Sequence, residues 1–342
     1  MIRIQEPRLD QLLAAMNGKR IAVVGDLMLD RYIWGSVSSI SPEAPVPVID
    51  METEQARLGG AANVAMNIKC LGGEPILVGA IGADNSGKQL FEIIREHKFS
   101  TEGVVVDPSR PTTVKTRVIA HSQHVVRIDR ETKEDISYTI QNKIMDILTH
   151  KIESIDGIII EDYNKGVIVS NLIKQVIDIA NEHGKCITID PKFNNFFEYK
   201  NVTLFKPNRY EVEEALGIRL RTEEDVQQAG RTLIERLHAN SVLLTLGEQG
   251  MSLFEANGEV HHIPTKAKTI ADVSGAGDTV ISTLTMSLVA GANVREAMTL
   301  ANFAGGIVCG YIGIVPIDKQ ELATYVQADM KEHNATGKTH NG

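Results

Sequence analysis

The feature that most constrains the fold is a repeated alternation of short, β-branched apolar runs with longer segments of helical spacing. This alternation is typical of a mostly parallel sheet covered by helices on both faces, so we predict an α/β protein. The expected strands are Arg20–Gly25, Pro75–Ile81, Asp156–Glu161, Lys185–Asp190, Val202–Phe205 and Ser241–Leu246. The expected helices are Gly60–Leu71, Gly87–His97, Ile136–Lys151, Ser170–Glu182, Arg209–Leu216, Glu223–Ala239, Ala276–Val289, Val294–Cys309 and Lys319–Glu332.

Two stretches interrupt this alternation. Residues 31–50 contain three prolines, which leave no room for the interior of a helix. Residues 112–130 alternate apolar and polar side chains, which predicts a pair of antiparallel strands joined near Ala120–Gln123. We expect these excursions, about 31–55 and 108–131, to form a small β-sheet lid. The rest of residues 1–335 is predicted to be one large domain, followed by a frayed polar tail at 336–342.

Composition excludes several classes of protein. The 35 basic and 44 acidic residues give a net charge of −9, which argues against nucleic-acid and anionic-membrane partners. No run approaches the roughly 18 apolar residues of a membrane-spanning helix, and the N-terminus lacks the apolar core of a signal peptide. The three cysteines are isolated, which suits a reducing compartment. We therefore expect a cytoplasmic protein.

The strongest chemical motif is the sequence DVSGAGDT at residues 272–279, which runs directly into a predicted helix. Its glycines lie at the helix N-terminus, where unpaired N–H groups and the helix dipole attract anions. Asp278 lies in the first turn, beside that anion site. The combination suits phosphoryl transfer to a hydroxyl group, with Asp278 accepting the proton. From spacing alone, a simpler role for Asp278 as a helix cap remains equally open.

A second glycine motif, at residues 82–88, has the GxxxxGK spacing of a phosphate-binding P-loop. Gln89 stands where such a loop has the Ser or Thr that ligates Mg²⁺. We therefore favour a strand-to-helix turn that Asp84 caps.

Several of these segments resemble the PfkB, or ribokinase-like, carbohydrate kinases. DVSGAGDT resembles the C-terminal signature of that family, RLGGAANVA at 57–65 resembles its Gly-Gly and Asn motif, and IGAD with Gly87 resembles its IGxDxxG turn. Thr283 departs from the signature, in which Ala or Gly is usual. The resemblance runs from about residue 20 to 325 and implies a ribokinase-like fold and a kinase that uses ATP and Mg²⁺. The catalytic residues that it implies are Asp278, Gly275, Ala276 and Gly277.

On the acceptor side, Asp26 and Asp30 follow the first predicted strand, where open α/β sheets bind ligands, although Asp is also a common turn residue. Lys115 and Arg117 share one face of a predicted lid strand and could bind one phosphate together, although an ordinary charged sheet face fits as well. The family resemblance adds the glycines and the asparagine of the N-terminal motif. The predicted substrate-binding residues are Asp30, Asp26, Gly59, Gly60, Asn63, Arg117, Lys115, Asp162 and Lys165.

On the nucleotide side, KPNRYE at 206–211 matches the PNxxE motif of the family, which implies that Glu211 reaches Mg²⁺ through water. Lys192 follows a predicted strand and could neutralise the transferring phosphate. The predicted ATP-binding residues are Lys192, Asn208, Arg209, Tyr210, Glu211, Thr245, Gly247 and Gly250. Residues 310–314 do not clearly reproduce the pattern with which relatives bind a monovalent cation, so a potassium requirement stays open.

Within the family, three segments resemble the kinases of D-glycero-β-D-manno-heptose 7-phosphate: GDLMLDRY at 25–32, SPEAPVPV at 41–48 and EDYNKG at 161–166. This resemblance implies phosphorylation of the anomeric 1-hydroxyl, for ADP-heptose and lipopolysaccharide synthesis. It also implies a homodimer that pairs through the lid. Because the chain ends soon after the kinase region, we expect no nucleotidyltransferase domain. The alternatives are another sugar or sugar-phosphate kinase and a non-catalytic sugar-phosphate sensor.

Overall fold

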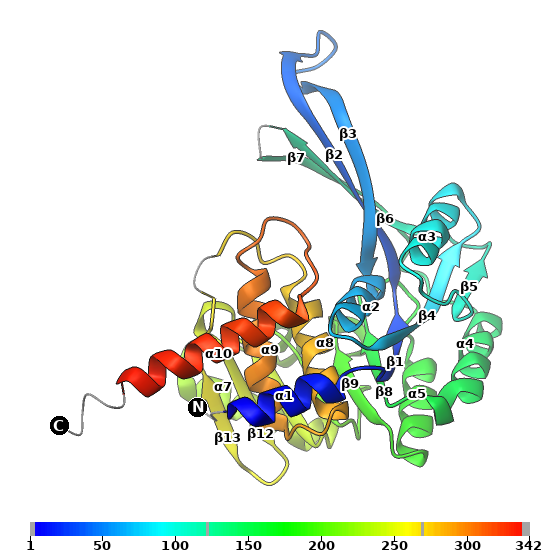
Figure 1. Cartoon of the computed structure of the whole chain (residues 1–342). Helices are drawn as coiled ribbons and strands as arrows, with labels where there is room; N and C mark the ends of the chain where they lie inside the picture. The colour runs from blue at the N-terminus through cyan, green and yellow to red at the C-terminus, as the bar shows by residue number, and fades with distance from the viewer. Residues whose placement is uncertain (1–3, 121–122, 268–269, 337–342) are drawn as a thin grey trace.

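The computed structural model describes residues 4–120, 123–267 and 270–336 (Figure 1). Residues 121–122, at the predicted turn of the second lid hairpin, lie outside the described residues, as do 337–342 of the predicted tail.

The helices agree closely with the predicted segments, and α5, α6 and α8 agree at both ends. The helices are α1 (Glu6–Ala15), α2 (Ala61–Cys70), α3 (Asn85–Glu96), α4 (Tyr138–Lys151), α5 (Ser170–Glu182), α6 (Arg209–Leu216), α7 (Glu223–Leu237), α8 (Ala276–Val289), α9 (Val294–Val308) and α10 (Lys319–Thr336). Helix α1 was not among the predicted helices.

The strands fall into two sheets. The strands of the main sheet are β1 (Arg20–Gly25), β4 (Glu74–Gly82), β5 (Val104–Asp107), β8 (Gly157–Glu161), β9 (Cys186–Asp190), β10 (Leu204–Phe205), β11 (Ser241–Thr245), β12 (Met251–Glu255) and β13 (Val260–Ile263). The strands of the lid sheet are β2 (Leu27–Ile40), β3 (Pro47–Gly60), β6 (Thr113–Ala120) and β7 (Gln123–Arg130).

The main sheet confirms the predicted α/β class. Within the described residues its order is β13-β12-β11-β10-β9-β8-β1-β4-β5. The strands from β11 to β5 pair in parallel, and β12 and β13 add an antiparallel edge. The carboxyl ends of the parallel strands therefore lie along one edge, where β1 leads directly into β2 and so into the lid.

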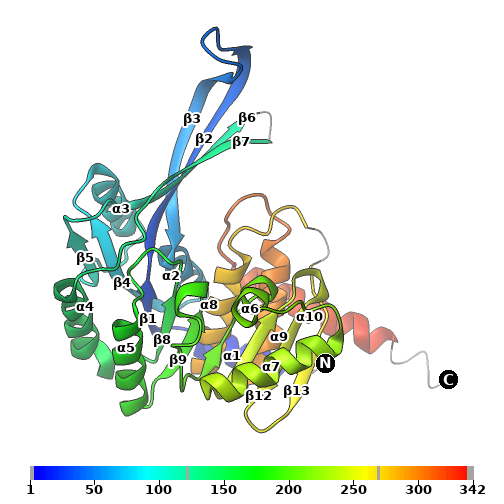
Figure 2. The same cartoon turned by 180° about the vertical axis from the view of Figure 1, so that it is seen from behind.

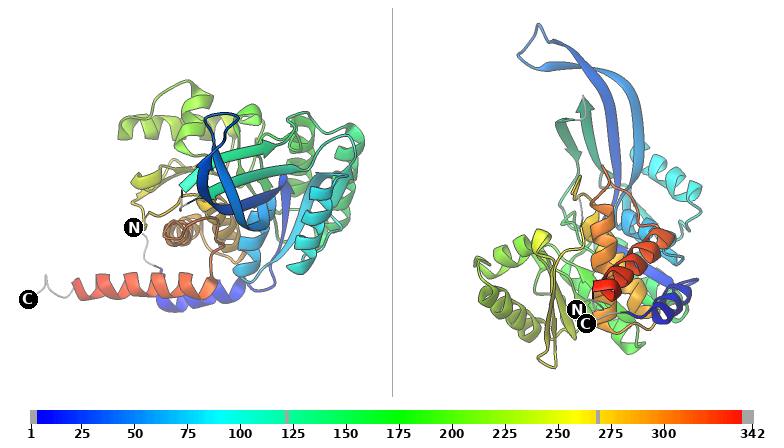
Figure 3. Two further views of the ribbon diagram at one scale, coloured as in Figure 1. Left: turned by 90° about the horizontal axis from the view of Figure 1, so that it is seen from above. Right: turned by 60° about the vertical axis from the view of Figure 1, so that its left-hand side comes forward.

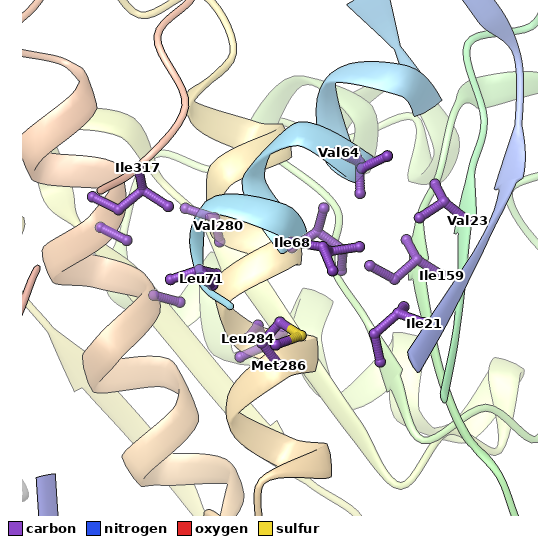
Figure 4. Close-up of a cluster of buried hydrophobic side chains, with 14 of the residues drawn as sticks. Ile21, Val23, Val64, Ile68, Leu71, Ile159, Val280, Leu284, Met286 and Ile317 are labelled. Atoms are coloured by element: carbon purple, nitrogen blue, oxygen red, sulfur yellow. The ribbon is translucent and has the colours of Figure 1, made fainter. Parts of the chain in front are cut away.

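Two layers of helices cover the sheet (Figures 1 and 2). One hydrophobic cluster joins the sheet to α1, α2, α8, α9 and α10, and Figure 4 shows part of it, where Ile68 and Leu284 pack near Ile21 and Ile159. The second cluster joins the other face to α4, α5 and α7 through residues such as Ile144 and Val176. Because alternate residues of β1 point into different clusters, its apolar run is buried on both faces, as in other parallel sheets.

The lid is a separate sheet of order β3-β2-β6-β7, which confirms the predicted small second sheet. The hairpin of β2 and β3 rises from the body of the molecule (Figure 3). Residues 41–46, with two of the three prolines, form its tip, and Pro47 begins β3. This hairpin spans residues 27–60, beyond the excursion of about 31–55 that the sequence indicated, because β2 continues almost directly from β1.

Three strands were missed. Strands β12 and β13 form an antiparallel hairpin at the sheet edge, and β5 is short. Strands β12 and β13 stand outside the regular alternation of strand and helix on which the prediction rests. Strand β5 follows α3 and pairs in parallel with β4, but it is only 4 residues long. No helix within 4–120, 123–267 or 270–336 has both the length and the apolar content needed to cross a membrane.

Candidate active site

Asp278 lies in the first turn of α8, and two side chains hold its carboxylate. Gly275 precedes the helix with a φ of 78°, a left-handed conformation that favours glycine. Asn63 Nδ2 of α2 donates to Asp278 Oδ2 at 2.6 Å, and the Tyr163 hydroxyl donates to Oδ1 at 2.8 Å. The first turn of α8, the Gly-Gly-Asn motif and the segment after β8 therefore meet at this one carboxylate.

Burial raises the pKa of Asp278 to about 6, and the negative charge of Asp190 acts in the same direction. The two hydrogen bonds and the Lys206 ammonium act against this rise. A carboxylate with such a pKa is ionised at neutral pH and is a better proton acceptor than an exposed aspartate.

Two buried aspartates hold the segment after β8. Asp26 accepts the backbone N–H groups of Tyr163 at 2.8 Å, Lys165 at 3.2 Å and Val167 at 3.2 Å. Asp162 accepts the Tyr199 hydroxyl at 2.7 Å and the N–H of Asn164 at 2.7 Å. Both aspartates, which the sequence placed in the substrate site, thus organise the loop that carries Tyr163, and direct sugar contact by either one stays a prediction.

A cavity of about 760 Å³ opens beside Asp278, which is one of the residues that line it. The predicted nucleotide-binding residues that line it are Lys192, Asn208, Arg209, Tyr210, Thr245, Gly247 and Gly250, together with Gly275, Ala276, Gly277 and Asp278. Its volume falls within the range of about 300–1,000 Å³ that is usual for ligand pockets. The sequence motifs therefore converge on one cavity that ends at the α8 N-terminus.

Each of two lysines that line this cavity is paired with a carboxylate. Lys206 Nζ contacts Asp190 Oδ2 at 2.8 Å, and Lys192 Nζ contacts Glu211. Burial lowers the pKa of both lysines, but the neighbouring carboxylates, Asp190 first, outweigh it and raise the pKa above its ordinary value. Both lysines are thus held as cations beside the helix N-terminus.

Glu161 completes this charged group at the end of β8. One carboxylate oxygen from each of Glu161, Asp190 and Asp278 lies within 4.8 Å of the others. Burial, followed by the charges of Asp190 and Asp278, raises the pKa of Glu161 well above its ordinary value. Glu161 therefore holds a proton more readily than an ordinary glutamate does.

Glu211 fits a contact to Mg²⁺ through water better than direct ligation. One of its carboxylate oxygens accepts the backbone N–H of Asn208 at 2.8 Å, in a capping box at the start of α6, and the other contacts Lys192. The Lys192 ammonium on one of these oxygens competes with a metal ion for the carboxylate charge. Glu211 does not line the cavity itself, whereas its neighbours Asn208 and Tyr210 do.

The lid turns a charged face toward Asp278. In the strand register, Asp30 of β2 pairs with Arg57 of β3 and with Lys115 of β6. Two residues further along, Tyr32 of β2 pairs with Arg117 of β6, and all five side chains lie on one face of the sheet. Arg117 contacts Asp30 at 2.5 Å, and both Arg117 and Arg57 lie 5.3 Å from the centre of the Tyr32 ring. A Cβ on Gly59 would lie 2.3 Å from Asp30 Oδ2, so any larger residue here would displace that carboxylate. We call this surface, with Arg127 and Asp129 at its outer strand, the charged lid face.

Other cations near the lid have partners elsewhere. Lys165 Nζ contacts Glu131 at 2.7 Å, and Arg130 contacts Asp84 at 3.1 Å on the opposite face of the lid. Asp84 also accepts the N–H of Gly87 at 2.8 Å, which confirms it as the N-cap of α3 and supports the turn rather than the P-loop interpretation.

Four residues of this site received no role from the sequence: Tyr163, Asp190, Lys206 and Arg57. All four lie within or beside motifs that were singled out, but their partners lie far away in the chain. Tyr163 and Asp278, for example, are 115 positions apart. Their position along the chain could have indicated three of them, because Asp190 ends β9, while Tyr163 and Lys206 follow the carboxyl ends of the neighbouring strands β8 and β10.

The fold and this site together define a phosphotransferase that acts on a sugar hydroxyl. The model of the pfkB family of carbohydrate kinases matches residues 19–319. The chain therefore belongs to the pfkB family of carbohydrate kinases.

Relatives and solved structures agree with this family. The chain is 41% identical over 305 residues to "Bifunctional protein HldE" of Helicobacter pylori strain J99, covering 89% of this chain and 66% of the relative. It is 38% identical over 319 residues to the HldE protein of Geobacter sulfurreducens, covering 93% and 65%. The chain thus spans about two thirds of the length of these relatives. The structure of Arabidopsis thaliana ribokinase complexed with ribose and ATP has the same fold, with a TM-score of 0.71, 20% identity, and coverage of 91% of this chain and 99% of that one.

Proposed function

We propose that this kinase transfers the γ-phosphoryl group of ATP to the anomeric 1-hydroxyl of D-glycero-β-D-manno-heptose 7-phosphate. The product is heptose 1,7-bisphosphate, a precursor of ADP-heptose for lipopolysaccharide. The observation that carries the proposal is the buried Asp278 carboxylate, which lies between the nucleotide-sized cavity and the charged lid face. The three sequence segments that resemble heptose 7-phosphate kinases support this choice of acceptor.

The chemistry needs a base, an anion site and cations in one place. The acceptor oxygen bonds to the γ-phosphorus as the bond from that phosphorus to the bridging oxygen of ADP breaks, and the hydroxyl proton passes to Asp278. The N–H groups at the start of α8 and the ammonium groups of Lys192 and Lys206 lie where they can stabilise the charge on the moving phosphoryl group. Bound Mg²⁺ would neutralise the ATP phosphates, with Glu211 holding its water.

The phosphate already on the substrate needs a second cationic site. The charged lid face carries Arg57, Lys115, Arg117 and Arg127 against Asp30 and Asp129. In this proposal Asp30 accepts sugar hydroxyl groups, while Lys115 and Arg117 bind the 7-phosphate. Gly59, Gly60 and Asn63 border the sugar between the lid and Asp278.

We also propose that the protein is a homodimer that pairs through the lid. Several apolar lid residues are exposed: Ile40 at 63%, Met51 at 61%, Ile128 at 56% and Val126 at 47%. Pairing with a second lid would cover this apolar surface. The expected mass in solution is that of two chains, and Ile128→Glu is expected to shift it toward one chain in light scattering. A wild-type mass of one chain would refute the dimer.

The test of the function is a panel of acceptors with ADP release as readout. The panel contains the β- and α-anomers of heptose 7-phosphate, fructose 6-phosphate, ribose and buffer alone. We expect the highest kcat/KM with the β-anomer of heptose 7-phosphate, and a new anomeric phosphate resonance in ³¹P NMR. A higher kcat/KM with another sugar identifies a different carbohydrate kinase. Binding of heptose 7-phosphate without any phosphoryl transfer would favour the sensor.

A further inference from the structure

Tyr163 lies where the three parts of the site meet. Its hydroxyl donates to Asp278 Oδ1 at 2.8 Å, and its side chain lines the nucleotide cavity. The Nζ atom of Lys115, from the lid, lies 5.1 Å from the centre of its ring. The Nζ atom of Lys192, from the nucleotide side, lies 5.4 Å from the same centre. One side chain thus contacts the base, a lid cation and a nucleotide-side cation.

The backbone leaves Tyr163 little freedom. Its own N–H donates to the buried Asp26 carboxylate, and so do the N–H groups of Lys165 and Val167. Asn164, the next residue, has a φ of 53°, and its N–H is held by Asp162. A ring that is fixed at its backbone and its hydroxyl, with two ammonium groups beside it, is preorganised to direct the carboxylate that it contacts.

We propose that Tyr163 is a positioning residue that, together with Asn63, fixes the Asp278 carboxylate toward the acceptor hydroxyl. The proposal rests on the function proposed above. Asn63 and Tyr163 each donate to a different oxygen of Asp278, and two such bonds fix the plane of the carboxylate. Each oxygen keeps lone-pair capacity for the incoming hydroxyl.

The hydrogen bond from Tyr163 also favours the ionised form of Asp278. Five groups face Asp278 from the surrounding elements. They are Asn63 of α2, Glu161 at the end of β8, Tyr163 just after β8, Asp190 at the end of β9, and Lys206 just after β10. Replacing Tyr163 with Phe removes one hydrogen-bond donor to Asp278 and leaves the other four of these groups in place. The pKa of Asp278 is then expected to rise.

The test compares Tyr163→Phe with Tyr199→Phe. Both changes remove a hydroxyl that donates to a carboxylate of this region, but Tyr199 contacts Asp162 and not Asp278. For Tyr163→Phe we expect kcat to fall about 10- to 100-fold, as for loss of a hydrogen bond to a charged group. We expect KM for ATP to stay within about twofold and the acid limb of the kcat/KM profile to move to higher pH. Tyr199→Phe is expected to lower the thermal midpoint without moving that limb.

The possible outcomes separate this inference from the proposed function. If wild type phosphorylates heptose 7-phosphate and Tyr163→Phe keeps wild-type kcat and acid limb, the inference is wrong. If both variants lose kcat equally with unmoved acid limbs, Tyr163 has a structural role only, which also overturns the inference. If wild type prefers another acceptor in the panel, the choice of substrate fails. The same comparison of variants is then made with that acceptor, with the same two results deciding it.

Discussion

Replacing Asp278 with Asn is expected to abolish most turnover while leaving the site assembled. The amide can keep both hydrogen bonds, because its oxygen can accept from Asn63 and its NH₂ group can donate to Tyr163, whose hydroxyl also accepts. The variant cannot take the acceptor proton. A general base contributes about 10²- to 10⁴-fold, so we expect turnover to fall at least 10²-fold with ATP binding within a few-fold.

The same substitution is expected to stabilise the protein above pH 6. Burial raises the pKa of Asp278 from 3.8 to about 6. A shift of about 2 pKa units corresponds to about 3 kcal/mol of unfolding free energy. Because the pKa of Asp278 is higher in the folded protein than in the unfolded chain, its contribution to stability is fully present below about pH 4. That contribution is lost as the pH rises from about 4 to about 6, and the loss is complete at pH 7.5. Removing the ionisable group recovers up to about 3 kcal/mol there and nothing below about pH 4.

The assay is thermal unfolding at several pH values beside steady-state ADP release. At about 2.1 cal/mol/K per residue, a chain of 342 residues has an unfolding entropy near 0.7 kcal/mol/K, so about 3 kcal/mol raises Tm by about 4 °C. Asp156→Asn is the matched control, because hydrogen bonds from Arg20 and Lys19 outweigh partial burial and lower the pKa of Asp156. That variant should lower Tm at pH 7.5 and leave turnover unchanged. Turnover of Asp278→Asn within fivefold of wild type would refute its role as base, and a lower Tm at pH 7.5 would refute the argument from burial.

Three further predictions concern pH, the lid and the metal. The kcat/KM of wild type should rise with pH through a midpoint near 6, where Asp278 ionises, and a profile flat from pH 5 to 8 would contradict this assignment. Gly59→Ala should raise KM for the sugar phosphate at least about tenfold and leave KM for ATP unchanged, because the new Cβ would displace the Asp30 carboxylate. Equal effects on the KM values of both substrates would indicate general misfolding. Chelation by EDTA should abolish turnover and added Mg²⁺ should restore it, whereas turnover that persists in EDTA would exclude the metal from the reaction.

The sequence predicted the elements whose signals are local. Helix α8 was predicted at both ends because the glycines of the GAGD turn and the apolar spacing after them fall within one short segment. The lid was recognised because prolines forbid a helix near residue 45 and apolar and polar side chains alternate over much of β6 and β7. The approach of PNxxE and LLTLGEQG to one cavity also follows from local patterns, since each motif ends or follows a predicted strand of the same sheet.

The contacts that decide the chemistry are not local. Nothing in EDYNKG indicates that the Tyr163 hydroxyl reaches Asp278, or that Asp26 binds the backbone of the same segment instead of facing outward. These contacts depend on the crossover connections, which bring the ends of β1 and β8 side by side and place α8 against them. Likewise, the register of β2 against β6 decides that Arg117 meets Asp30, and a shift of one residue would have turned it to the other face.

The pairing of charges explains how a chain of net charge −9 can attract two anionic substrates. Lys206, Lys192 and Arg117 each contact a carboxylate, so their charges are largely balanced before a ligand binds. Lys115 differs, since within the described residues its ammonium has the Tyr163 ring as its neighbour and no carboxylate in contact. Burial also lowers the pKa of Lys115, and an incoming phosphate would relieve this effect by stabilising the charged form. Lys115 and the α8 N-terminus are therefore among the positive groups available at first encounter, and the paired cations act once a phosphate competes with their carboxylates.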